Sequence, residues 1–175
     1  MSRTASDGDP SAWGVDRANA LVSVEGAAAD RELVRAAGRY VAWTGGRLTV
    51  LNVMPSGAFA DRRHARERLA GFGRFTLAQA ETERRCSAEY VAREALEGVP
   101  VEYDCVGVVG REPDRILVEA SERACGHVFL SDRRRSSLGA VGARDVVDEV
   151  VEAFEGTVTV LRDLPDSESR QVELV

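Results

Sequence analysis

A run of basic residues in the last third of the chain could bind an anion. Arg133, Arg134 and Arg135 stand in sequence and are followed closely by Ser136 and Gly139. Guanidinium groups hold phosphate and carboxylate oxygens through paired, charge-assisted hydrogen bonds. Two interpretations stay open: the arginines form an anion site at a helix N-terminus, or they are a solvated run that pairs with nearby aspartates. Surface charge runs are usually only solvated, so we favour the second.

No other grouping predicts catalysis. The three cysteines, Cys86, Cys105 and Cys125, have no C-x-x-C spacing and lie among apolar or helical neighbours, so we expect buried free thiols and no metal. The two histidines, His64 and His127, are far apart and share no motif, which favours structural or surface roles. Neither a Ser–His–Asp set nor a pair of carboxylates can be defended, and we expect a protein without catalytic residues.

The composition narrows the classes of partner. All 23 basic residues are arginine, 29 residues are acidic, and the net charge of −6 disfavours nucleic acid or an anionic membrane. The chain has neither an apolar run long enough to span a bilayer nor the apolar core of a signal peptide, which predicts a cytoplasmic protein. We expect flexible tails over residues 1–18 and 164–175 and a single domain over residues 19–163.

The elements that would position these residues follow from the hydrophobic pattern, which switches repeatedly between strand-like and helix-like. Strands are predicted over residues 20–25, 47–53, 99–106, 127–130 and 157–161. Helices are predicted between them: over residues 29–42, over about 22 residues from Leu77, and over a segment with Pro113 in its first turn. A last helix is predicted along a stripe of Val146, Val147, Val150, Val151 and Phe154. Residues 56–73 carry no clear pattern.

Strands that alternate with helices form a parallel sheet covered on both faces, here a three-layer α/β/α sandwich of five strands. Ligands of such sheets bind at the carboxyl ends of the strands, where the strand order reverses. The loops that follow residues 25, 53, 107 and 130 are therefore the predicted site.

Four segments in these places resemble the universal stress protein family. Glu25-Gly26 resembles the Asp-Gly that ends its first strand, and Leu-Thr-Val-Leu-Asn-Val-Met-Pro over residues 48–55 resembles its second strand. Residues 110–117 resemble its Gly-Asp-Pro-x-x-x-Ile-Leu segment with one residue added, and residues 133–139 resemble its Arg-Gly-Arg-Ser-Gly-Leu-Gly segment. The resemblance implies a Rossmann-like fold of the adenine nucleotide alpha-hydrolase type with strand order 3-2-1-4-5. It also implies a homodimer through the last strand, which begins at Thr157.

ATP-binding members of that family carry Gly-x-x-Gly, nine residues, and then Gly-Ser or Gly-Thr. Laid on this chain without gaps, the pattern falls on Ser131, Arg134, Arg144 and Asp145, and every position differs. A two-residue gap would bring glycine to residue 142 but would turn the valine stripe of the last helix outward, so we prefer the ungapped register. Asp145 would then place a carboxylate where a phosphate oxygen binds, which costs a few kcal/mol if the site is poorly solvated.

The resemblance also places two residues beside an adenine. Glu25 takes the place of the family's strand-end aspartate, and Val53 would lie under the base or serve as ordinary strand core. The implied pocket, vestigial or remodelled, comprises Val24, Glu25, Gly26, Val53, Gly110, Ser131, Arg133, Arg134, Arg135, Ser136, Gly139, Arg144 and Asp145.

Three functions are weighed. The leading expectation is a non-catalytic regulatory domain that binds ATP weakly or not at all, needs no cofactor, and contacts another protein. The first alternative binds ATP or AMP with Arg133 to Arg135 in place of the glycine loop. The second is a nucleotidyl-transfer enzyme of the same architecture, which the missing Ser-Gly-Gly-x-Asp-Ser and His-x-Gly-His signatures disfavour.

Overall fold

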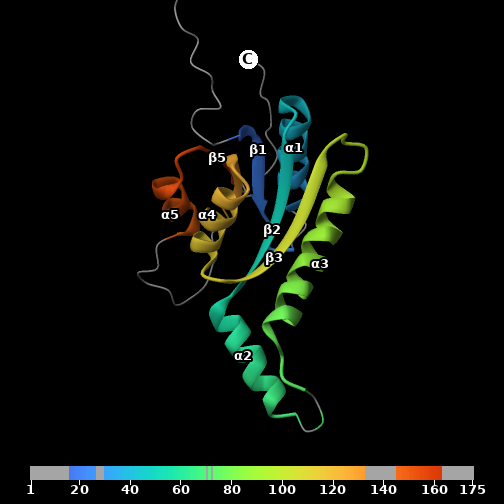
Figure 1. Ribbon diagram of the computed structural model, residues 1–175, viewed down its shortest axis with the longest axis vertical. Coiled ribbons are helices and arrows are strands. Elements are labelled where there is room, and N and C mark those ends of the chain that lie inside the picture. The colour runs from blue at the N-terminus through green and yellow to red at the C-terminus, as the bar shows by residue number, and fades with distance from the viewer. Residues whose placement is uncertain (1–15, 27–29, 70, 72, 133–144, 163–175) are drawn as a thin grey trace, which may run out of the picture.

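The computed structural model describes residues 16–26, 30–69, 71, 73–132 and 145–162, and within them the chain alternates between strands and helices (Figure 1). The elements are β1 (Asp16–Ser23), α1 (Asp30–Thr44), β2 (Arg47–Pro55), α2 (Ser56–Glu67), α3 (Leu77–Ala95), β3 (Glu102–Gly110), α4 (Glu112–Glu122), β4 (Cys125–Asp132), α5 (Val146–Ala153) and β5 (Thr157–Arg162). All strand pairs are parallel, and the sheet order is β3-β2-β1-β4-β5. The predicted fold class and strand order are confirmed.

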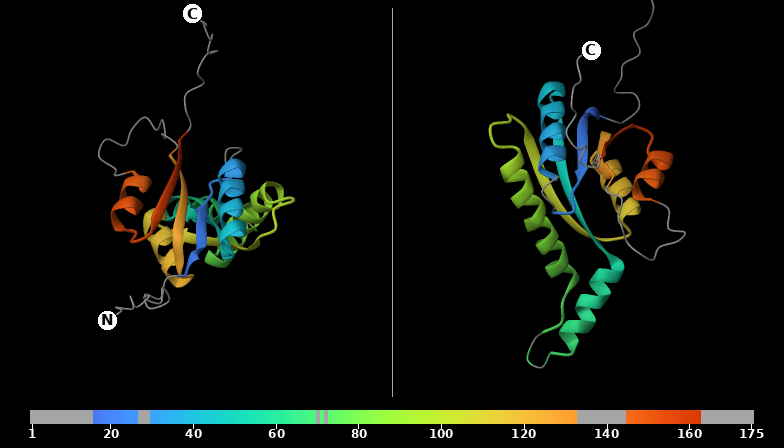
Figure 2. Two further views of the ribbon diagram at one scale, coloured as in Figure 1. Left: turned by 90° about the horizontal axis from the view of Figure 1, so that it is seen from above. Right: turned by 180° about the vertical axis from the view of Figure 1, so that it is seen from behind.

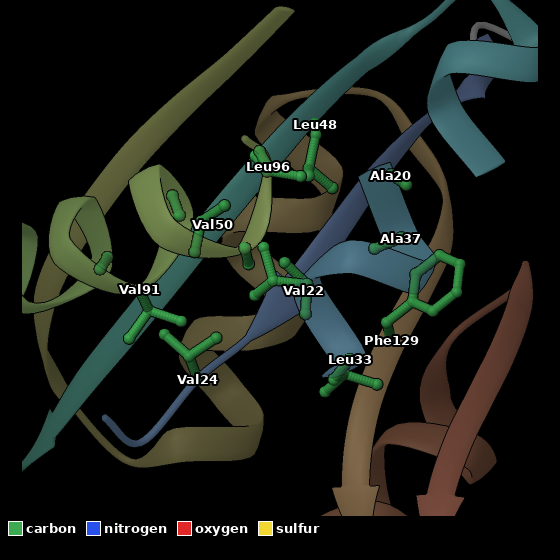
Figure 3. Packing of buried hydrophobic residues seen from close by; sticks show 14 of the residues in the cluster. Ala20, Val22, Val24, Leu33, Ala37, Leu48, Val50, Val91, Leu96 and Phe129 are labelled. Atoms are coloured by element: carbon green, nitrogen blue, oxygen red, sulfur yellow. The ribbon is translucent and has the colours of Figure 1, made fainter. Parts of the chain in front are cut away.

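Helices cover both faces of the sheet, as the view from above shows (Figure 2). Alternate residues of the central strands point to opposite faces. On β1, Ala20 and Val22 pack with Leu33 of α1 and Val91 of α3, whereas Leu21 packs on the other side. The first of these two clusters is drawn in Figure 3. The second joins β1 and β4 to α4 and α5, and it includes the completely buried Ile116 and Val150. These two layers fix the sheet that carries the candidate site.

The third strand differs from its prediction. It starts at Glu102 rather than at residue 99 and runs on to Gly110, paired residue by residue with β2. Gly107 interrupts the apolar pattern, which is why the prediction stopped at residue 106. A side chain at Gly107 would collide with the backbone of Glu81 and Arg85, so α3 packs directly on this glycine. The interruption in the pattern therefore marks a contact between α3 and β3.

Other boundaries also differ. β1 begins at Asp16, inside the segment we assigned to the first tail, and ends at Ser23 rather than at residue 25. The segment without a clear pattern contains α2, whose residues are all exposed or half-buried. The expectation of buried thiols is wrong for Cys86, which is exposed, while Cys105 is half-buried and Cys125 is buried. None of the described helices is long and apolar enough to cross a membrane.

Candidate functional site

The loop that leaves β1 begins at the point where the strand order reverses, because β1 lies between β2 and β4. Val24 is buried, and its N–H donates to the carbonyl oxygen of Leu51 at 2.8 Å, which continues the pairing with β2. Glu25 and Gly26 are exposed, and Gly26 has a φ of +96° that favours glycine. The chain therefore turns sharply away from the sheet at the expected edge.

Asp30, the first residue of α1, holds this loop in place. Its side chain is almost completely buried, with 1% of the residue exposed. One carboxylate oxygen, Oδ2, accepts the N–H of Glu25 at 3.0 Å and the N–H of Gly26 at 2.6 Å. A carboxylate is favoured at a helix N-terminus by the helix dipole. The buried carboxylate at this strand end thus belongs to Asp30, and the predicted Glu25 is exposed.

Sequence reasoning missed Asp30. An acidic residue at the start of a predicted helix is a recognised N-terminal signal, and it follows the strand-end glycine by four residues. That signal could have placed Asp30 at the loop. Its contact with the two backbone amides requires the turn at Gly26.

A polar pair lies under the same loop. Asn52 of β2 is 1% exposed, and its Nδ2 donates to Oγ of Ser87 in α3 at 3.3 Å. A Cβ added to Gly26 would lie 3.2 Å from that Oγ, so the loop passes close to Ser87. Oδ1 of Asn52 is buried and has no hydrogen-bond partner among the described residues. Val53, on the opposite face of β2, is half-buried and packs against the cluster under α4 and α5.

Ser131 and Asp145 lie on the second side of the switch point. Ser131 precedes the last residue of β4, and its half-buried side chain has a buried Oγ without a hydrogen-bond partner in the described part of the chain. Asp145 is the N-cap of α5, and its Oδ1 accepts the N–H of Val147 at 3.2 Å. Because Asp145 is exposed, its repulsion of an anion is about 1 kcal/mol per charge pair, less than the sequence suggested.

The valine stripe of α5 faces the core only in part. Val150 is buried, and Val146, Val147 and Phe154 are half-buried against the cluster under α4 and α5. Val151 is 53% exposed, so its predicted inward position is wrong. The helix has eight residues and covers only the edge of the sheet, which leaves one flank of the stripe uncovered.

Gly110 is not part of the same cluster. It ends β3, which is separated from β1 by β2, and it pairs with Pro55. A Cβ at Gly110 would lie 2.7 Å from Cγ and 2.8 Å from Cδ of Arg115. Arg115 crosses the glycine and binds the buried Glu119 at 2.8 Å. Gly110 therefore makes room for an arginine of α4.

Of the predicted pocket the structure describes Val24, Glu25, Gly26, Val53, Gly110, Ser131 and Asp145. Gly110 lies apart from the loop after β1, because β2 separates their strands. Arg133, Arg134, Arg135, Ser136, Gly139 and Arg144 lie outside the described residues. The described residues contain no cluster of three His, Cys, Asp or Glu side chains that could hold a metal ion. At the candidate site, carboxylates bind backbone amides. Two buried polar atoms of the site, Asn52 Oδ1 and Ser131 Oγ, have no hydrogen-bond partner among the described residues.

The model of the universal stress protein family matches residues 17–162, almost all of the described chain. The chain belongs to the universal stress protein family. No curated protein matches it in sequence.

Solved structures resemble this universal stress protein in fold. The hypothetical protein MJ0577, whose biochemical function was assigned from its structure, aligns with a TM-score of 0.63 and 14% identity, over 86% of this chain and 99% of its own. A universal stress protein in complex with cAMP aligns at 0.54 and 15%, over 82% and 95%. One from Archaeoglobus fulgidus in complex with dAMP aligns at 0.51 and 17%, over 81% and 95%. At these identities the likeness concerns the fold.

Proposed function

We propose that this universal stress protein is a non-catalytic regulatory domain, and that its site at the strand ends binds adenine nucleotides weakly or not at all. The observation that carries the proposal is the carboxylate of Asp145 on the backbone N–H of Val147, at the N-terminus of α5. Helix N-termini bind phosphate because their N–H groups lack partners within the helix. Here a side chain of the chain itself binds one of these N–H groups, that of Val147, and adds a negative charge beside the others.

The loop after β1 supports the same conclusion. The N–H groups of Glu25 and Gly26 both donate to Asp30, so these two donors are already satisfied. Each of the two helix N-termini at the switch point, those of α1 and α5, therefore carries a carboxylate that repels a nucleotide phosphate.

The surroundings of His127, a buried histidine, support a structural role for it and not a catalytic one. Its ring stacks on Phe129 at 4.2 Å between centroids and meets Tyr40 edge-on at 4.5 Å. Its Nε2 lies 2.8 Å from Oγ1 of Thr159. Desolvation by burial lowers the pKa of His127, so the ring is neutral near pH 7. An enclosed neutral ring of this kind ties β4 to β5.

Calorimetric titration with Mg-ATP, AMP and cAMP tests the proposal. We expect no heat of binding at about 1 mM of any of these nucleotides, since binding weaker than millimolar corresponds to less than about 4 kcal/mol. Asp145→Ser keeps a capping oxygen but removes the charge, and it should tighten binding about fivefold or more. Glu152→Gln, which removes an exposed charge from the last turn of the same helix, is the matched control and should change the affinity less than about twofold. Micromolar binding by the unaltered protein that Arg134→Ala abolishes would overturn the proposal.

A second candidate function is nucleotide binding through a remodelled loop. The buried Oγ of Ser131 favours it, because a hydroxyl without a described partner stands at the end of β4. The relatives solved with cAMP and dAMP share this fold. In this case Ser131→Ala should weaken AMP binding, whereas a change in the core of the same strand should not.

We further propose a homodimer through β5, in the cytoplasm. Among the described strands β5 pairs only with β4, so its outer edge carries unpaired backbone groups. Thr157 and Thr159 are exposed there, and Val158, Val160 and Leu161 are half-buried. Sedimentation velocity should show a dimer that Val160→Lys converts to a monomer, because a charged side chain on an edge strand opposes pairing with a second strand. A monomeric unaltered protein at high concentration would contradict this assembly.

A further inference from the structure

Helix α2 is only lightly held by the rest of the domain. It starts directly after β2 and projects beyond the end of the sheet, beside the first turns of α3 (Figures 1 and 2). None of its twelve residues is buried. Phe59 lies 5.8 Å from Phe75 between ring centroids, and Nη1 of Arg62 binds both carboxylate oxygens of Glu83 at 2.5 and 2.6 Å. Because exposed ion pairs contribute little to stability, the Arg62–Glu83 pair attaches α2 to the domain only weakly.

A groove with a volume of about 450 Å³ separates α2 from α3. It is lined by Arg62, Ala65, Arg66, Leu69, Phe75 and Glu83. Apolar atoms form most of its floor, and Leu69 is 56% exposed although it is a large apolar side chain. Aromatic and arginine side chains around an apolar centre are the composition of protein-binding hot spots. The groove thus offers an apolar anchor site framed by charge.

The positive charge of the segment around the groove favours an acidic partner. Residues 61–74 contain five arginines and two acidic residues, whereas the chain as a whole has a net charge of −6. Arg62, which lines the groove, lies over the ring of Phe75 at 5.8 Å, and Arg63 of the same helix lies over the ring of Phe59 at 5.9 Å. A partner that presents acidic side chains would be attracted, while basic segments would be repelled.

We propose that the groove between α2 and α3 docks an acidic amphipathic helix of a partner protein. The apolar atoms of the groove would receive the apolar ridge of a third helix lying across α2 and α3, and the flanking acids of that helix would meet the arginines. This inference goes beyond the proposed nucleotide response, because the groove lies outside the switch point and shares no residue with it.

An anionic membrane fits the same region less well. The rings of Phe59 and Phe75 face each other between the two helices instead of forming an outward apolar face. A protein helix that lies across the groove would contact the apolar atoms that line it and needs no such outward face.

Fluorescence anisotropy with a labelled model peptide tests the docking. The probe is a helical peptide of about 18 residues, with leucines at i, i+3, i+4 and i+7 and glutamates at most other positions. We expect binding at about 10–100 μM that weakens as salt rises. Leu69→Asp should weaken it at least about tenfold. Leu77→Asp is the matched control, because Leu77 at the start of α3 is 51% exposed but does not line the groove. This variant should change the affinity less than about twofold.

Hydrogen exchange locates the peptide independently, and amides of residues 56–69 should be slowed when it binds. The proposal is overturned if the glutamate peptide does not bind at 1 mM, because a binding free energy of about 4 kcal/mol would already be detected at that concentration. It is also overturned if a peptide with lysine at every glutamate binds as well, or if Leu69→Asp and Leu77→Asp have equal effects. Binding of vesicles of anionic phospholipid through residues 56–69, with no peptide binding, would assign the groove to a membrane instead.

Discussion

Replacing Asp30 by alanine should destabilise the domain more than any exposed helix cap does. The carboxylate is buried and accepts two backbone N–H groups, at 3.0 Å from Glu25 and at 2.6 Å from Gly26. A hydrogen bond to a charged group contributes about 1.5–3 kcal/mol to stability. Two such bonds would give about 3–6 kcal/mol, but Glu25 and Gly26 are exposed, and water replaces part of what they lose. We therefore expect the free energy of unfolding to fall by about 2–4 kcal/mol.

Urea unfolding followed by circular dichroism measures this change. Asp30→Asn preserves the shape and one acceptor oxygen but removes the charge, so it should cost about half as much as Asp30→Ala. Asp145→Ala is the matched control, because Asp145 is also an aspartate at a helix N-terminus but is exposed and accepts a single N–H, from Val147 at 3.2 Å. Loss of such a cap costs about 1 kcal/mol.

The relative losses in unfolding free energy of Asp30→Ala, Asp30→Asn and Asp145→Ala show how Asp30 stabilises the loop. If Asp30→Ala costs no more than Asp145→Ala, the two backbone bonds at the β1 loop do not stabilise the fold as described. If Asp30→Asn costs as much as Asp30→Ala, the charge and not the geometry of the acceptor is responsible.

Three other perturbations test the packing. Burial lowers the pKa of His127 below 6.5, so the unfolded chain binds more protons and the free energy of unfolding should fall as the pH drops below about 6.5. His127→Phe should remove this part of the pH dependence, and parallel curves of unfolding free energy against pH for the two proteins would contradict it. Gly107→Ala should cost about 2–3 kcal/mol in urea unfolding, since its Cβ would overlap the backbone of α3, and a loss below about 0.5 kcal/mol would refute this packing. A thiol reagent should label only Cys86 in the folded protein, because burial raises the pKa of Cys105 and Cys125 to about 11; rapid labelling that survives Cys86→Ser would contradict this.

Much of the fold could be predicted from local patterns. The switch between period two and period 3.6 located the five strands and four of the five helices of the described residues, because the apolar face of each element is encoded in residues close in sequence. Pro113 was expected in the first turn of its helix and is found there, since proline at that position loses no helical hydrogen bond. Helix α2 escaped because it buries no residue and so carries little apolar periodicity.

The candidate site was less predictable. Local sequence placed Glu25 and Gly26 at the end of the first strand, but it could not show that Asp30 folds back onto their amides or that Asn52 meets Ser87, 35 residues later. Contacts of this kind depend on which elements become neighbours, and the sequence pattern carries no direct record of them.

By itself, then, the sequence determined the alternation of elements, the covered parallel sheet and the family, because these follow from composition, periodicity and short motifs. Only the tertiary structure decided the extent of β3, which pairs with β2 as far as Gly110, and the exposure of Val151 in a short helix. It also decided that Asp30 rather than Glu25 is the buried carboxylate. In each case the deciding contact joins backbone or side chains of separate elements, and such contacts exist only once the sheet has assembled.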